Sequence, residues 1–169
     1  MESNPREALA FLDTVKPDPI TAQQAVYPKA FFYAVAYKNL GDTVRARDAY
    51  EAARPILEVE VEKNPKRSYQ HALLARAYAG LGRKEDALRE AQAAVEALPI
   101  SLDALDGCVV EMHRALVEAG VGEKDAAVEH IRHMLSIPCL LSPGLLRTDS
   151  GWWPLRDDPR FRKLAQFDG

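Results

Sequence analysis

Apolar positions between residues 68 and 99 recur at helical intervals on both sides of a single glycine. The positions are Leu74, Ala75 and Tyr78, followed by Ala87, Ala91 and Ala94. Each set falls on one stripe of a helix, and the small residues of the second stripe allow two helices to approach closely. Gly82 lies between the sets, where a left-handed residue typically ends a helix. The pattern predicts two antiparallel helices joined by a tight turn.

The segments on either side carry versions of the same pattern. The preceding one surrounds Gly41, and its matching positions are Tyr33, Ala34, Tyr37, Ala46, Tyr50 and Ala53. Its second helix is expected to continue to Lys63, with a kink at Pro55. The following one surrounds Gly122, and its matching positions are Ala115, Ala127, Ile131 and Met134. In this third unit Arg114 and Glu118 replace the leucine and tyrosine of the best unit.

These units resemble the tetratricopeptide repeat. Between residues 68 and 99 the matching positions are Leu74, Ala75, Tyr78, Gly82, Ala87, Ala94 and Pro99. Two positions depart from the family pattern, because His71 stands where tryptophan is usual and Ala91 where an aromatic residue is usual. The resemblance implies an all-α fold, in which antiparallel helix pairs stack into an alpha-alpha superhelix.

The expected organisation has two regions, helical repeats over residues 1–138 and a C-terminal cap over 139–169. The repeats cover about 27–65, 66–99 and 103–138, and a lone helix over 5–16 precedes them. That helix carries the stripe of a second repeat helix in Ala8, Leu12 and Val15. The chain is therefore expected to begin within a repeat and to belong to a longer natural protein.

The C-terminal region combines helix signals with large aromatic residues. Asp158 is expected to cap a short helix that starts at Pro159 and ends near Gln166. Trp152, Trp153 and Phe161 are expected to pack against the third repeat and close it. From Leu98 onward the chain resembles the end of bacterial multidomain regulators, whose repeats are attached to kinase, nucleotide-cyclase or winged-helix domains. No sheet is expected anywhere in the chain.

Composition narrows the possible partners. The 169 residues are 47% hydrophobic and 28% charged, as in one folded domain. The formal charge of -3 argues against nucleic acid. The apolar stretches, such as residues 30–37, are shorter than the roughly 20 residues of a membrane span, and the first residues lack a secretory signal. Cys108 and Cys139 are expected to be reduced packing residues.

No catalytic, cofactor or metal site is expected. His130 and His133 lie three residues apart with Cys139 beyond them, but no HExxH motif occurs and a proline intervenes. The carboxylate pairs are Asp157 with Asp158 and Asp103 with Asp106, and helix starts explain them better than acid/base chemistry. Neither a GxSxG elbow nor a GxxxxGK loop is present. The chain is therefore not expected to be an enzyme.

In the tetratricopeptide family the first helix of each pair lines a concave side that receives a partner's peptide or helix. The partner groove predicted on this basis consists of Phe31, Val35, Lys38, Tyr69, Ala72, Arg76 and Met112. Co-chaperone members grip a terminal carboxylate with Lys and Asn. The corresponding positions here hold Phe31, Val35, Ala72 and Arg76. Because that clamp is missing, an apolar or amphipathic segment is the expected cargo.

The leading hypothesis is a non-catalytic, regulatory protein-protein interaction module that binds a partner or an upstream domain of its own polypeptide. One alternative is a scaffold that self-associates and has no peptide groove. Another is a binder of small molecules or nucleic acid, which would need a deep basic groove. The expected location is the cytoplasm, or the outside of the membrane if the parent protein has an anchor.

Overall fold

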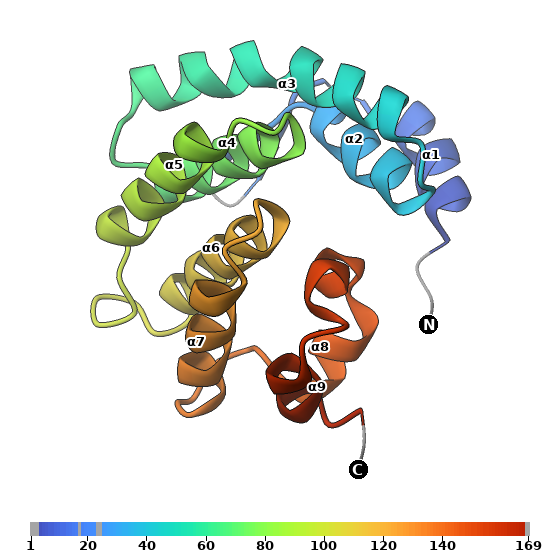
Figure 1. Ribbon diagram of the computed structural model, residues 1–169. Coiled ribbons are helices and arrows are strands. Elements are labelled where there is room, and N and C mark those ends of the chain that lie inside the picture. Colours follow the sequence, from blue (N-terminus) through green and yellow to red (C-terminus); the bar gives the residue numbers. More distant parts are fainter. Residues whose placement is uncertain (1–3, 17, 23–24, 168–169) are drawn as a thin grey trace.

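The computed structural model describes residues 4–16, 18–22 and 25–167. The outer ends of the two expected regions, residues 1–3 and 168–169, lie outside this part. The elements in chain order are α1 Pro5–Thr14, β1 Ile20–Ala22, β2 Ala25–Tyr27, α2 Lys29–Asn39, α3 Thr43–Lys63, α4 Ser68–Gly80, α5 Lys84–Ala97, α6 Asp106–Gly120, α7 Lys124–Leu135, α8 Pro143–Thr148, the 3-10 helix η1 Ser150–Leu155, and α9 Pro159–Ala165. The helices form an arc, and α8, η1 and α9 fold back into its open side (Figure 1).

The all-α class is confirmed, because neighbouring helices pack together along the whole arc. Three helix pairs, α2 with α3, α4 with α5 and α6 with α7, are each joined by a short turn. Gly41, Gly82 and Gly122 lie in these turns with φ of 76°, 77° and 89°. A side chain would be strained there, so glycine ends each first helix as predicted. Helix α3 continues through Pro55 to Lys63 as predicted, and the kink expected at Pro55 stays a prediction.

The expectation of no sheet is wrong. Strands β1 and β2 form a two-stranded antiparallel hairpin with Ile20 opposite Tyr27. The buried side chain of Gln70 on α4 binds β2 through both of its polar atoms. Its Oε1 accepts from the Val26 N–H at 3.0 Å, and its Nε2 donates to the Val26 carbonyl at 2.9 Å. Strands of three residues are too short to show a period-two pattern, and a long-range contact stabilises them.

Polar networks fill two of the positions that depart from the repeat pattern. His71 bonds to Glu90 at 2.7 Å and to the Pro65 carbonyl at 2.9 Å. In the third pair the buried Glu118 accepts from Arg114 at 3.0 Å and contacts His130 Nδ1 at 2.7 Å. Because their polar atoms are paired, these residues occupy the core without an unsatisfied charge.

The C-terminal segments pack against α6 and α7. Asp158 caps α9, since its side chain accepts from the Arg160 N–H, and the helix starts at Pro159 as predicted. Trp152 and Phe161 are completely buried in a core shared with α6 and α7. Trp153 does not join them, because 49% of its surface is exposed. The prediction is therefore wrong for Trp153, because the turn of η1 directs it to a different side from Trp152.

The prediction of reduced cysteines is also wrong. Cys108 on α6 forms a disulfide with Cys139, which lies in the link between α7 and α8. The two residues are 31 positions apart, and their Cα atoms are separated by 5.8 Å. The link returns along the start of α6, so the two thiols meet although their spacing in the sequence gives no sign of it. The disulfide links the third helix pair covalently to the cap.

Candidate functional site

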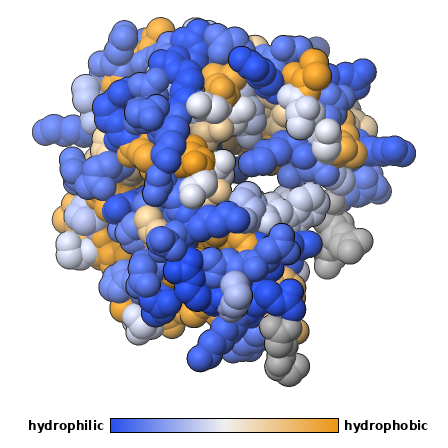
Figure 2. All heavy atoms as spheres, viewed as in Figure 1, coloured by the Kyte–Doolittle hydropathy of each residue, from blue (hydrophilic) through white to orange (hydrophobic). Residues whose placement is uncertain are grey.

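A pocket of about 750 Å³ lies between the arc of helices and the C-terminal segments. Helices α2, α4 and α6 supply one side, with α3 contributing at its base, and α8 and η1 supply the other. Figure 2 shows the surface hollowed between these parts. Its volume lies within the usual range of ligand pockets, about 300 to 1,000 Å³. It is the leading candidate for a binding site.

Four cations line this pocket. Lys38 and Arg76 come from α2 and α4, and Arg147 and Arg156 come from α8 and the end of η1. Within the described residues none of the four forms an ion pair with a carboxylate. Asp149 is the one carboxylate in the lining, and it accepts from the Gly151 N–H at 2.8 Å. The lining therefore carries an excess of positive charge.

On the side of the arc, Arg76 lies over an aromatic ring and close to Lys38. The guanidinium carbon of Arg76 is 5.2 Å from the centre of the Phe31 ring, a cation-π contact that holds the side chain at the pocket wall. Lys38 is accessible from the pocket but crowded by protein atoms on its other sides. This crowding and the Arg76 cation lower the pKa of Lys38, while Asp149 opposes them.

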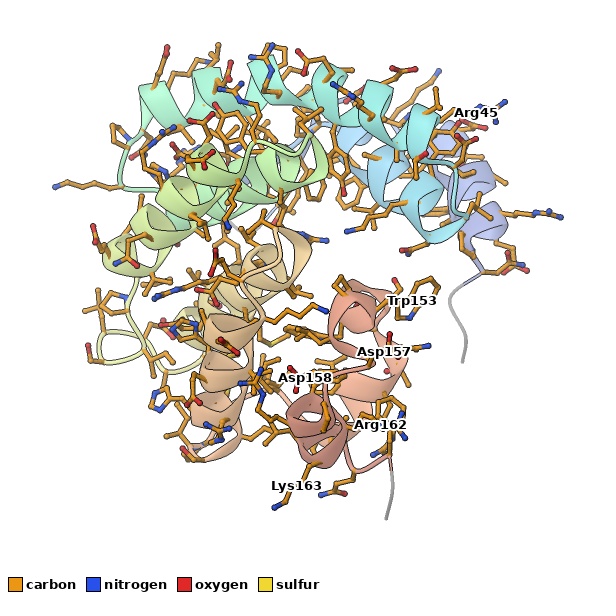
Figure 3. All side chains as sticks on the ribbon, viewed as in Figure 1. Arg45, Trp153, Asp157, Asp158, Arg162 and Lys163 are labelled. Atoms are coloured by element: carbon orange, nitrogen blue, oxygen red, sulfur yellow. A yellow bond between two sulfur atoms is a disulfide. The ribbon has the colours of Figure 1, made fainter. Side chains whose placement is uncertain are left out.

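On the side of the cap, Arg156 and Trp153 form a second cation-π pair, with 5.1 Å between the guanidinium carbon and the ring centre. Figure 3 shows Trp153 on the part of the cap that faces α2. Arg147 donates to the Ala165 carbonyl at 2.6 Å, which holds its side chain against α9. These contacts position two cations and one exposed aromatic ring beside the pocket.

A hydrogen bond joins the two sides at the rim. The Ser150 hydroxyl donates to Asn39 Oδ1 at 2.8 Å, between residues 111 positions apart. Both residues line the pocket. The C-terminal cap therefore contacts the first helix pair as well as the third, and the pocket is bounded on both flanks.

The structure brings three of the predicted groove residues together, because Val35, Lys38 and Arg76 all line the pocket. Phe31 and Ala72 do not line it, since they are 2% and 1% exposed and belong to the core. The ring of Phe31 instead packs against the guanidinium of Arg76 in the cation-π contact. The sequence places Phe31 and Ala72 on the concave side of the first helices, but neighbouring helices cover both residues.

The remaining two predicted groove residues also lie outside the pocket lining. Tyr69 is half-buried, and its hydroxyl donates to Asp106 Oδ1 at 3.1 Å, which links α4 to the start of α6. Burial and the Asp106 carboxylate raise the pKa of Tyr69 to about 12. Met112 is half-buried and packs against the core shared with the cap. Both residues make structural contacts between neighbouring elements.

Sequence reasoning missed the pocket residues of the cap, namely Arg147, Trp153 and Arg156. The sequence pattern predicts that Trp153 joins the core, and the two arginines belong to no motif. A signal was nevertheless present. Trp153 and Arg156 are three positions apart, the spacing at which side chains on a helical turn meet.

Several of the groups considered for chemistry have local partners. Cys139 is bonded to Cys108, and His130 contacts Glu118. Asp103 accepts from the N–H groups of residues 105 and 106 at 2.9 Å, the expected role at a helix start. In the described ranges no three His, Cys, Asp or Glu residues are grouped so as to hold a metal ion.

Over the residues that the structure describes, no helix combines the length and apolar character that crossing a bilayer requires. No protein-family model, curated protein or solved structure gives a significant match to the chain.

Proposed function

We propose that this protein is a non-catalytic interaction module of tetratricopeptide-like architecture, which binds a peptide segment in the pocket between the arc and the cap. The segment belongs to a partner protein or to another domain of the same polypeptide, and its binding has a regulatory role. The observation that carries the proposal is the pocket of about 750 Å³, bounded by three different helix pairs and the cap.

Two features of the fold support this function. Three helix pairs with glycine turns form an arc, and the pocket lies on its inner side, the arrangement in which helical repeats hold partners. The pocket walls also combine apolar side chains with cations, including Val35, Leu116 and Trp153 beside Arg76. Arginine and aromatic residues are the types that most often supply binding energy.

A second candidate function is the binding of a small anionic molecule, which the basic pocket favours. The pocket is open on one side, whereas sites for small molecules usually bury about 70 to 90% of the ligand surface. We therefore prefer a peptide that extends beyond the rim. The Cys108–Cys139 disulfide supports an extracytoplasmic location over the cytoplasmic one, because disulfides persist in oxidising compartments.

The proposal is tested by blocking the pocket. Peptides are selected from a random-sequence display library on the intact protein, and their affinities are measured for a Gly120→Phe variant. Gly120 lines the pocket, and a Cβ atom added there meets nothing within 4 Å, so the new ring enters the pocket without a clash at its base. We expect Gly120→Phe to weaken peptide binding by about tenfold or more.

The matched control is Ala52→Phe, which adds the same ring on the exposed surface of α3. It should bind the peptides as the wild type does, and both variants should keep the wild-type melting temperature. Unchanged binding by Gly120→Phe would place the peptide elsewhere. Self-association that rises with concentration in sedimentation, without peptide selection, would favour the scaffold alternative.

A further inference from the structure

We infer that the pocket recognises an acidic peptide segment, with the carboxylates of Asp and Glu side chains held between the cations of the arc and those of the cap. This inference rests on the proposed function and names the class of its ligand. It departs from the apolar or amphipathic cargo expected from the sequence. The recognition surface is composite, since Lys38 and Arg76 belong to the repeats and Arg147 and Arg156 to the cap.

The charge of the pocket lining is complementary to that of an acidic peptide. The chain has a formal charge of -3, yet its pocket lining has four cations and one carboxylate, a formal charge of +3. Outside the pocket several arginines are paired at close range with carboxylates, as Arg54 is with Glu51 and Glu58. The four cations make this lining positive, so the site raises the local concentration of anionic segments.

The arginines of the pocket lining have hydrogen-bond donors available for a peptide. A guanidinium carries five N–H donors in a planar fork that matches a carboxylate. Arg147 and Arg156 each use one donor on a backbone carbonyl, at 2.6 and 3.4 Å. Arg76 uses none on a described protein acceptor, and its cation-π contact leaves the edge of the guanidinium accessible. Three arginines thus retain donors for bidentate contacts with carboxylates.

The state of Lys38 agrees with this assignment. Its pKa is lowered by the surrounding protein and by Arg76, so its charged form is less favourable there than in water. A carboxylate placed between Lys38 and Arg76 offsets both effects, because an opposite charge favours the ammonium form. Binding of an anion at this point relieves the repulsion between two cations that the fold holds together.

The surroundings of the cations favour a peptide over other polyanions. A nucleic acid strand needs cations along an extended path, whereas the residues outside the pocket lining together carry the chain's excess of negative charge. Apolar walls at Val35, Leu116 and Trp153 lie between the cations and suit side chains that alternate with carboxylates. A small inorganic anion would leave those walls without contacts.

The test uses the intact protein and the peptides selected from the random library. We expect the selected peptides to be enriched in Asp and Glu, and replacement of these residues by Asn and Gln to weaken binding by about tenfold or more. Lys38→Gln and Arg156→Gln should each weaken binding about three- to tenfold, and a variant with both changes should weaken it further. Affinities are measured by fluorescence anisotropy at two salt concentrations.

The control variant is Arg47→Gln, which removes an exposed arginine of α3 outside the pocket and should leave the affinity unchanged. Lys38 and Arg156 are exposed, so melting curves should show that their variants remain folded. Peptides that are neutral or basic would overturn the inference. If Gly120→Phe still abolished their binding, the proposed function would stand while its acidic ligand would not.

Sodium pyrophosphate serves as the small-anion probe. For an acidic peptide ligand, it should compete only weakly, because it cannot contact the apolar walls. Complete displacement at concentrations below the peptide's own dissociation constant would assign the pocket to a small anion and would overturn the inference.

Discussion

Replacing Trp152 with alanine is expected to lower the free energy of unfolding by about 3 to 5 kcal/mol. Trp152 is completely buried in the core that α6 and α7 share with the cap, beside Phe161 and Leu155. Its indole Nε1 has no hydrogen-bond partner among the described residues, so its contribution comes from packing. Such a loss is a large part of the roughly 5 to 15 kcal/mol that stabilises a domain.

Trp153 provides the matched control, because it is the adjacent residue of the same type. About half of its surface is exposed, and its described ring contact is with Arg156. The Trp153→Ala change should cost about 0.5 to 1 kcal/mol, the value of an exposed cation-π contact. Urea unfolding of both variants provides the comparison. Equal destabilisation by the two changes would contradict the assignment of Trp152 to the core.

Reduction of the Cys108–Cys139 disulfide is expected to lower the free energy of unfolding by about 3 to 4 kcal/mol, the chain-entropy value for residues 31 positions apart. The bond restricts the unfolded chain and holds the link after α7 against α6. Urea unfolding with and without a reducing agent measures the difference.

A variant in which both cysteines are replaced by alanine isolates this effect. It should show the lower stability under both conditions and no response to the reducing agent. Equal stability of the oxidised and reduced wild-type protein would show that the cross-link contributes nothing to the fold.

Local signals predicted the helices well and the tertiary contacts poorly. Gly41, Gly82 and Gly122 marked the turns because their conformation is a property of a single residue. Asp158 marked the start of α9 for the same reason. The β1–β2 hairpin depends on Gln70, which lies more than 40 positions away from Val26, and no local pattern records that contact.

The pocket could be predicted only in part, for a similar reason. Lys38 and Arg76 lie on the first helices of their pairs, so the repeat pattern was enough to predict them as groove residues. Their counterparts on the cap, Arg147 and Arg156, depend on how the last three helices fold back across the arc. That path is set by the burial of Trp152 and Phe161 and by the disulfide, which are contacts between distant parts of the chain.

The central claim, that the pocket is the ligand site, is tested most directly by the two indole N–H signals of the protein in a nitrogen-15 NMR spectrum. The chain has two tryptophans, one beside the pocket and one in the core of the cap. Titration with a selected acidic peptide should shift the Trp153 indole signal in proportion to occupancy and leave the Trp152 signal nearly unchanged. Shifts confined to the outer surfaces of α3 and α5, with the Trp153 signal unmoved at saturation, would contradict the account.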